Sequence, residues 1–302
     1  MKNTGFVELE SYRLSRYTES APCYICGGGN NFDAENCRVC SAPMALFHQA
    51  QSQRVPPHML AAIGSAGAGK TVYLGMLTDM LSHPTQPVQL LARGAYSISL
   101  QQQTVGALSR CQFPAKTPNE PDRWKWAHCQ LLRKKQRPLE LILPDVAGES
   151  LMEEVEHPNT FPILGKFLAK CAGVMLLVDA ARVAHGESEE DFSTMKLISY
   201  LCELQQDPKS GWGTRPVAIV FTKADQCEHC FDDPQQFASR HTPGVVQQCG
   251  ERLRRHRFFA SGVAGACGFH SDRYGGRVHA PLRIEPRGLV EPFLWLVQEL
   301  GV

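Results

Sequence analysis

Eight consecutive residues in the first third of the sequence have the spacing of a phosphate-binding loop, GxxxxGK[ST]. Glycines let successive backbone N–H groups converge on one concave spot that side chains would otherwise fill. Lys70 is placed to reach the β- and γ-phosphates of a nucleotide, and the Thr71 hydroxyl is placed to hold Mg²⁺. The alternative is a glycine-rich turn before an ordinary helix. The phosphate-binding residues of this hypothesis are Gly64, Ser65, Ala66, Gly67, Ala68, Gly69, Lys70 and Thr71.

An apolar run at 139–143 leads into Pro-Asp-Val-Ala-Gly-Glu at 144–149. An acidic residue at the tip of a buried strand is placed to bind Mg²⁺ directly or through water, so Asp145 is a candidate ligand. The glycine three residues later, Gly148, can present its backbone N–H to a terminal phosphate. The alternative is that Asp145 caps the helix that follows.

Four cysteines near the N-terminus form two CxxC pairs separated by ten residues: Cys23, Cys26, Cys37 and Cys40. This spacing favours tetrahedral Zn²⁺ over the alternatives, an iron–sulfur cluster or a redox pair. So short a segment cannot bury a core of its own, and the metal would supply its folding energy. A closed four-thiolate site has no open coordination position, so we expect a structural cap or a docking module and no catalysis.

The other cysteines leave a second metal site open. Cys227 and Cys230 could bind a metal together with Cys249, or with Cys267 and His270, but these residues have no recognisable ligand spacing. The alternative is a pair of ordinary loop cysteines. A basic run at 252–257 has two interpretations as well: a solvated helix end, or a patch for phosphate or an acidic partner.

Composition excludes several classes of protein. The chain has 302 residues, 43% of them hydrophobic, and a formal net charge of +1. The near-neutral charge makes nucleic acid an unlikely partner, and no apolar run reaches transmembrane length. The N-terminus has no apolar signal core, so we expect a cytoplasmic protein with reduced thiols.

The motifs require a sheet that holds them at one edge. Apolar runs at 124–133, 139–143, 173–179, 216–221 and 257–261 predict strands, the first two as an antiparallel hairpin at the sheet edge. Helical patterns at 96–110, 159–171, 188–206, 244–256 and 289–300 alternate with these strands, and a glycine-rich loop follows residue 261. We expect an N-terminal arm (1–20), a zinc ribbon (21–45), a linker (46–57) and a three-layer α/β/α domain (58–302) with a mainly parallel sheet and an antiparallel edge strand.

Together these motifs resemble GTPases of the TRAFAC, Ras-like class of P-loop proteins, over residues 58–302. The resemblance implies that Asp145–Gly148 senses the γ-phosphate and that Thr222, Lys223 and Asp225 read guanine, with Ser261 in the last base-binding loop. A carboxylate accepts both N–H groups on the Watson–Crick edge of guanine, which adenine does not offer in that pattern. For the switch I threonine we choose Thr117, in the proline-rich loop 113–121; the alternative is an ordinary loop residue.

The details also resemble the bacterial double-GTPase type associated with conflict (defence) systems. The shared features are the cysteine-rich N-terminus, GKTVYL, DVAGE, TKAD and a C-terminal Glu-Pro-Phe-Leu-Trp helix. The resemblance implies a GTP-hydrolysing switch that signals to a protein partner or a second GTPase. Glu149 stands where Ras-type enzymes have a glutamine; a carboxylate repels the γ-phosphate, so we expect slow intrinsic turnover.

Two other functions remain open at this point. One is an ATP-using P-loop enzyme, and the other is a nucleotide-binding scaffold whose zinc ribbon recognises the partner. The sequence does not rank the candidates for an arginine finger, which are Arg93, Arg110, Arg123 and Arg182.

Overall fold

The computed structural model describes residues 20–53, 57–83, 88–134, 136–204, 211–271 and 276–301. The expected N-terminal arm, residues 1–20, lies outside this part of the chain apart from Ser20. In the described residues, no helix is both long enough and apolar enough to span a membrane.

A seven-stranded sheet forms the centre of the molecule, in the order β4-β5-β6-β3-β7-β8-β9. Strands β6, β3, β7, β8 and β9 pair in parallel, whereas β5 pairs antiparallel with both β4 and β6. The fold is therefore a P-loop three-layer α/β/α domain whose edge strand is antiparallel to its neighbour. The strand bounds are β3 His58–Ile63, β4 Val88–Arg93, β5 Lys125–Arg133, β6 Leu139–Asp145, β7 Gly173–Asp179, β8 Val217–Thr222 and β9 His256–Ala260.

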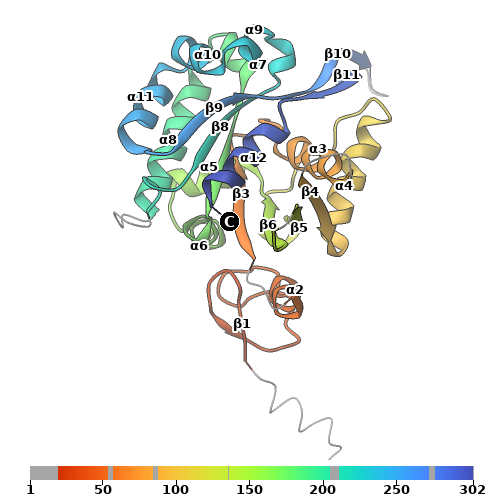
Figure 1. Ribbon diagram of the computed structural model, residues 1–302, viewed down its shortest axis with the longest axis vertical. Coiled ribbons are helices and arrows are strands. Elements are labelled where there is room, and N and C mark those ends of the chain that lie inside the picture. Colours follow the sequence, from red (N-terminus) through yellow and green to blue (C-terminus); the bar gives the residue numbers. More distant parts are fainter. Residues whose placement is uncertain are drawn as a thin grey trace, which may run out of the picture.

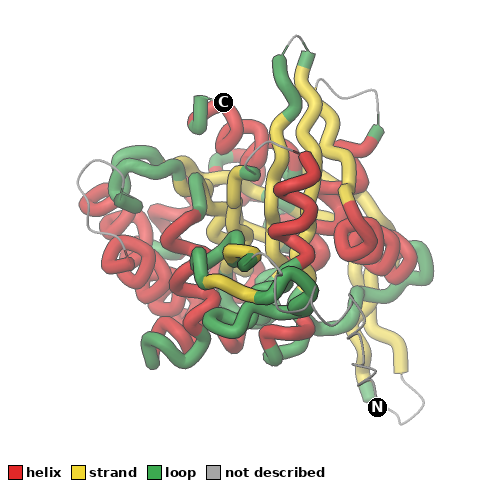
Figure 2. The backbone as a smooth tube through the Cα atoms, turned by 90° about the horizontal axis from the view of Figure 1, so that it is seen from below, coloured by secondary structure: helices red, strands yellow, loops and turns green. Residues whose placement is uncertain are grey.

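Helices cover both faces of this sheet, as Figures 1 and 2 show. One buried core lies under α5, α6, α8, α10 and α11, and the other lies under α3, α4 and α12. Alternate residues of each central strand enter opposite cores, as expected for strands buried on both sides. The helix bounds are α3 Lys70–Ser82, α4 Gly94–Leu108, α5 Gly148–Glu156, α6 Pro162–Lys170, α7 Ala180–Ala184, α8 Ser188–Leu204, α9 His229–Asp232, α10 Pro234–His241, α11 Pro243–Arg252 and α12 Val290–Glu299.

Two parts of the predicted sheet need correction. The predicted hairpin, now β5 and β6, is not at the sheet edge, because β4 pairs with residues 128–133 of β5 and is the outermost strand. The stretch after Ser261 is not a loop but a separate antiparallel hairpin, β10 (Gly262–Ser271) and β11 (Arg277–Arg287), which projects from the domain (Figure 1). Its register shifts where glycine and alanine weaken the ladder, which concealed the strand pattern in the sequence.

The cysteine-rich module packs onto the main domain through a shared core. It contains two short strands, β1 (Ala21–Pro22) and β2 (Gly29–Asn30), and it lies at the foot of β3 in Figure 1. Most of the segment 46–57, for which we predict a linker, forms helix α2 (Ala45–Gln53). Ile25, Met44 and Leu46 join the same buried cluster as Trp124 and Trp126 of the main domain.

Candidate functional site

The loop between β3 and α3 needs glycine for reasons that the structure makes explicit. A Cβ on Gly64 would lie 2.2 Å from the carbonyl oxygen of Leu177, so the loop passes closer to β7 than any side chain permits. Gly67 and Gly69 have φ of 80° and 81°, in the left-handed region that favours glycine. These positions let the loop wrap around the N-terminus of α3, where unpaired N–H groups bind anions.

Lys70 is held within this loop. Its side chain is buried and donates to the carbonyl oxygens of Gly64 at 3.1 Å and Ser65 at 2.8 Å. Burial lowers the pKa of Lys70 to about 8, although the carboxylates of Asp145 and Glu149 oppose this effect. The ammonium group thus lies among loop carbonyls and two nearby acids, and a phosphate oxygen would provide it with a better partner.

Two hydroxyls and a carboxylate meet beside Lys70. Thr71 Oγ1 lies 2.9 Å from Thr117 Oγ1 and donates to the Asp145 carboxylate at 2.9 and 3.1 Å. Thr117 Oγ1 also lies 3.1 Å from Asp145 Oδ2. Burial raises the pKa of Asp145, and the bonds from both threonines oppose the rise. These three oxygen groups, drawn from three separate segments, have the donor chemistry that Mg²⁺ prefers, so the site fits that ion.

The helix-cap alternative for Asp145 is wrong. Helix α5 begins at Gly148, its N-cap is Ala147, and no side chain caps it. Asp145 instead points at the two threonines, 2% exposed.

Gly148 and Glu149 begin α5 directly against the phosphate-binding loop. A Cβ on Gly148 would lie 2.6 Å from the backbone nitrogen of Ala66 and 2.7 Å from Lys70 Nζ, so only glycine fits here. Glu149 forms an ion pair with Lys116, one residue before Thr117. Although partial burial would raise the pKa of Glu149, the Lys116 ammonium lowers it, and the group is a carboxylate at neutral pH.

The predicted base-reading residues lie at the neighbouring strand ends. Thr222 Oγ1 donates to the carbonyl oxygens of Ala68 at 2.9 Å and Val178 at 3.1 Å, which fixes the phosphate-binding loop to β7 and β8. Lys223 has φ of 54° and forms an ion pair with the Asp179 carboxylate. The structure therefore shows Thr222 in a supporting position rather than as an open binding group.

Asp225 and Ser261 complete this end of the site. Both line the same cavity as Lys70 and Thr71. Burial raises the pKa of Asp225, and the backbone N–H of Val263 opposes the rise. Ser261 is buried, and its carbonyl oxygen accepts from Ala224 N at 3.1 Å, which joins its loop to the segment that carries Asp225.

Most of the predicted site residues line one cavity of about 320 Å³, within the range of small-molecule sites. They are Gly67, Gly69, Lys70, Thr71, Thr117, Gly148, Glu149, Thr222, Lys223, Asp225 and Ser261, whereas Asp145 is not among the lining residues. The outer wall of the cavity comes from the β10–β11 hairpin, through Val263, Ala264, Cys267 and His279, which the sequence did not indicate. The His279 ring stacks on Phe113 of the proline-rich loop, with ring centres 5.7 Å apart. The hairpin and that loop thus meet across the cavity.

A buried glutamate behind the loop was also missed. Glu190, in the first turn of α8, accepts from Ser65 Oγ at 2.6 Å and from Arg182 at 2.7 Å. Acidic residues are common in the first turn of a helix, so nothing in the sequence pattern indicates this role for Glu190. Arg182 also binds Glu187 and Glu189, so it is engaged within its own chain rather than free to act as an arginine finger.

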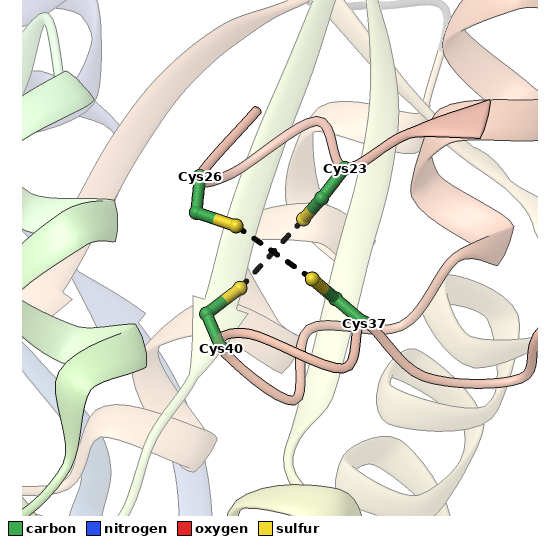
Figure 3. Close-up of side chains that lie close together, drawn as sticks. All are labelled: Cys23, Cys26, Cys37 and Cys40. Atoms are coloured by element: carbon green, nitrogen blue, oxygen red, sulfur yellow. Dashed lines mark hydrogen bonds between the residues drawn. The ribbon is translucent and has the colours of Figure 1, made fainter. Parts of the chain in front are cut away.

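The four N-terminal cysteines converge as the spacing predicts. Figure 3 shows their sulfur atoms pointing at one centre, and all four lie within 4.8 Å of one another. The Cys23–Cys40 and Cys26–Cys37 sulfur pairs are 3.7 and 3.6 Å apart. Thiolates around Zn²⁺ at about 2.3 Å would be separated by about 3.8 Å in a regular tetrahedron, so the cluster fits zinc.

The second metal site is not supported. Within the described residues, the N-terminal cysteines are the sole cluster of metal-ligand type, and Cys227 and Cys230 are buried among apolar side chains. Cys249 is buried in the same core. The side chain of His270 lies outside the described part of the structure.

Comparisons with known proteins place the chain among GTPases. Solved structures that resemble it include the small COPII coat GTPase SAR1 from Encephalitozoon cuniculi in complex with GDP (15% identity, TM-score 0.39, covering 81% of this chain and 80% of that chain). Another is nucleolar GTP-binding protein 1 from Plasmodium falciparum (10% identity, TM-score 0.43, 81% and 87%). A search of curated proteins found no match. The sequence model described as "Double-GTPase 2" matches residues 58–263, more than half of the sequence, and the chain belongs to that family.

Proposed function

We propose that this protein binds GTP with Mg²⁺, hydrolyses it slowly, and acts as a switch that signals to a protein partner. The observation that carries the proposal is the meeting of Thr71, Thr117 and Asp145, which brings the phosphate-binding loop, the proline-rich loop and the β6 strand end to one point. A γ-phosphate and its Mg²⁺ would hold all three segments together, and hydrolysis would release them. The resemblance to the bacterial double-GTPase type extends the proposal to a bacterial defence system.

In this proposal Thr71 and Asp145 hold Mg²⁺, with Thr117 as the switch I hydroxyl. The metal would neutralise charge on the phosphates. The residues of the chain position the nucleotide: Lys70 and the loop N–H groups bind phosphate oxygens, and Gly148 brings its N–H to the γ-phosphate. Asp225 accepts the guanine N–H groups, which makes GTP rather than ATP the substrate.

Slow turnover follows from the surroundings of Glu149. Its carboxylate pairs with Lys116, and it has no N–H group to donate to the γ-phosphate. Glu149 therefore cannot orient the attacking water through an amide group. A protein partner or a second GTPase would have to supply what is missing.

The decisive experiment combines nucleotide competition with phosphate release. We expect unlabelled GTP, but not ATP, to displace fluorescent GDP from the Mg²⁺-loaded chain, and Thr117→Val to weaken binding of a non-hydrolysable GTP analogue more than binding of GDP. Thr160→Val, which removes an exposed hydroxyl outside the cavity, is the control. Displacement by ATP would favour the alternative of an ATP-using enzyme. Turnover on the order of tens per second by the isolated chain would contradict the switch.

A further inference from the structure

A second cavity lies where the cysteine-rich module meets β5 and the start of α4. It has a volume of about 610 Å³, larger than the nucleotide cavity, and we call it the module groove. The lining that matters is aromatic and acidic: Phe32, Asp33, Glu35, His48, Tyr96 and Trp124. Neither the nucleotide site nor the zinc site accounts for it.

Two aromatic side chains of the module groove, those of Phe32 and Tyr96, are open to solvent. Phe32 is 50% exposed and Tyr96 is 55% exposed. His48 packs edge-on against Phe32, with ring centres 4.6 Å apart, and bonds to the Phe32 carbonyl oxygen at 3.0 Å. The first turn of α4, which carries Tyr96, is tied to β5 because Ser97 Oγ accepts from His128 N at 2.7 Å. Exposed aromatics on a rigid frame are typical of binding surfaces.

The negative charge of the module groove favours a positively charged partner. Asp33 and Glu35 are exposed, and neither has an ion-pair partner among the described residues. No lysine or arginine is among the described residues that line it. Carboxylates beside aromatic faces bind a guanidinium well, through paired hydrogen bonds and cation–π contact.

The floor of the module groove is joined to the switch. Trp124 is buried there, and its indole Nε1 donates to the carbonyl oxygen of Pro118 at 2.9 Å. Pro118 is the neighbour of Thr117, whose hydroxyl meets Thr71 and Asp145. A rearrangement of the loop that carries Thr117 would therefore move or free a side chain in the groove.

We propose that the module groove is the docking site for a partner-protein segment in which an arginine stands beside an apolar side chain, and that the nucleotide state controls its affinity. The arginine would lie between the carboxylates of Asp33 and Glu35 and the ring of Tyr96, and the apolar side chain would pack against Phe32 and Trp124. The nucleotide dependence, but not the docking itself, rests on the proposed GTP switch.

The test uses short random peptides displayed on phage and selected on the zinc-loaded full chain, in its GDP form and with a non-hydrolysable GTP analogue. We expect enriched sequences to share an arginine next to an aromatic or aliphatic residue. A synthetic copy should bind about tenfold more weakly to Glu35→Lys and to Tyr96→Ala. The matched controls Glu251→Lys and Phe192→Ala change an exposed glutamate and a 59% exposed aromatic elsewhere and should leave binding unchanged.

Several results would overturn this assignment. Enrichment of acidic peptides, no enrichment at all, or peptides that bind Tyr96→Ala as well as the parent would each exclude it. Self-association that Tyr96→Ala abolishes, without peptide binding, would assign the groove to a second copy of the chain. Zinc content and tryptophan emission establish that each variant is folded. Equal peptide affinity in both nucleotide states would refute the coupling, whereas failure to bind fluorescent GDP would refute the proposed function and leave the docking result standing.

Discussion

Glu190 offers a sharp test of how the phosphate-binding loop is held. Its side chain is 1% exposed and accepts hydrogen bonds from three groups: Ser65 Oγ at 2.6 Å, Arg182 at 2.7 Å and Asp179 N at 3.3 Å. It thereby links the loop after β3 to the end of β7, whose Asp179 carboxylate in turn pairs with Lys223. Replacing Glu190 should therefore disturb the site as well as the fold.

The size of the effect follows from these contacts. Hydrogen bonds to a buried carboxylate contribute about 1.5–3 kcal/mol each, and removing one partner of a buried charged pair costs about 3–5 kcal/mol. Glu190→Ala should lower the free energy of unfolding by about 3–5 kcal/mol, a large part of the stability of a typical domain. Ser65→Ala removes one bond and should cost about 1.5–3 kcal/mol. Glu190→Gln keeps an acceptor for Ser65, so its loss of unfolding free energy should be smaller than that of Glu190→Ala.

Urea unfolding and fluorescent GDP titration, run on the same variants, check both consequences. The double variant Ser65→Ala/Glu190→Ala should show a coupling energy of about 1–3 kcal/mol, because the two side chains are in contact and each single change removes that contact. GDP affinity should fall about tenfold for each 1.4 kcal/mol of free energy that no longer holds the phosphate-binding loop in its binding conformation. Glu189→Gln changes the exposed partner of Arg182 and is the control. Unchanged GDP affinity in a folded Glu190→Ala protein would refute the reasoning.

Three further predictions test the site and the module. Gly148→Ala should weaken binding of the GTP analogue about tenfold and GDP binding far less, because the new Cβ would meet the loop 2.6 Å from Ala66 N; equal losses in calorimetry would count against a γ-phosphate contact. GDP affinity should fall on acidification at a higher pH than an ordinary aspartate explains, since burial raises the pKa of Asp225 and only its carboxylate accepts both guanine N–H groups; Asp225→Asn should lose this dependence and gain affinity for xanthine nucleotides. A zinc chelator should release about one zinc per chain and change tryptophan emission, because Trp124 packs against the module. If tryptophan emission does not change when zinc is removed, the module folds without the metal.

The sequence predicted the parts of the site that depend on local backbone chemistry. The phosphate-binding loop, the strand end at Asp145 and the paired cysteines all use fixed spacings, because a turn, a strand tip or a knuckle imposes them. Thr117 was chosen for its place in a loop, and the structure does bring it to Thr71. No spacing rule leads to Thr117, because the length of the loop between the preceding helix and β5 is not constrained by the backbone.

What the sequence did not predict depends on contacts between distant segments. Strand β4 is only partly buried along most of its length, as is usual for an edge strand, and its pairing with β5 shows only in the fold. Glu190 and Ser65 are 125 residues apart, and no local pattern records their bond. The β10–β11 hairpin was hidden by glycine and alanine, yet it supplies one wall of the nucleotide cavity.

Besides the Phe113–His279 stack, three contacts hold the loop that carries Thr117, and in the proposed switch they would determine how a nucleotide signal leaves the site. Ser150 of α5 donates to the carbonyl oxygen of Asn119 at 2.9 Å, Trp124 donates to that of Pro118, and Lys116 pairs with Glu149. Two of these contacts lead to α5, which starts at Gly148, and one leads to the module groove. If hydrolysis frees Thr117 from Mg²⁺, the loop cannot move without breaking contacts on both sides, so α5 and the module groove should respond together. Hydrogen exchange in the two nucleotide states would detect this as joint loss of protection in 148–156 and 30–48; protection lost at α5 alone would separate the zinc module from the switch.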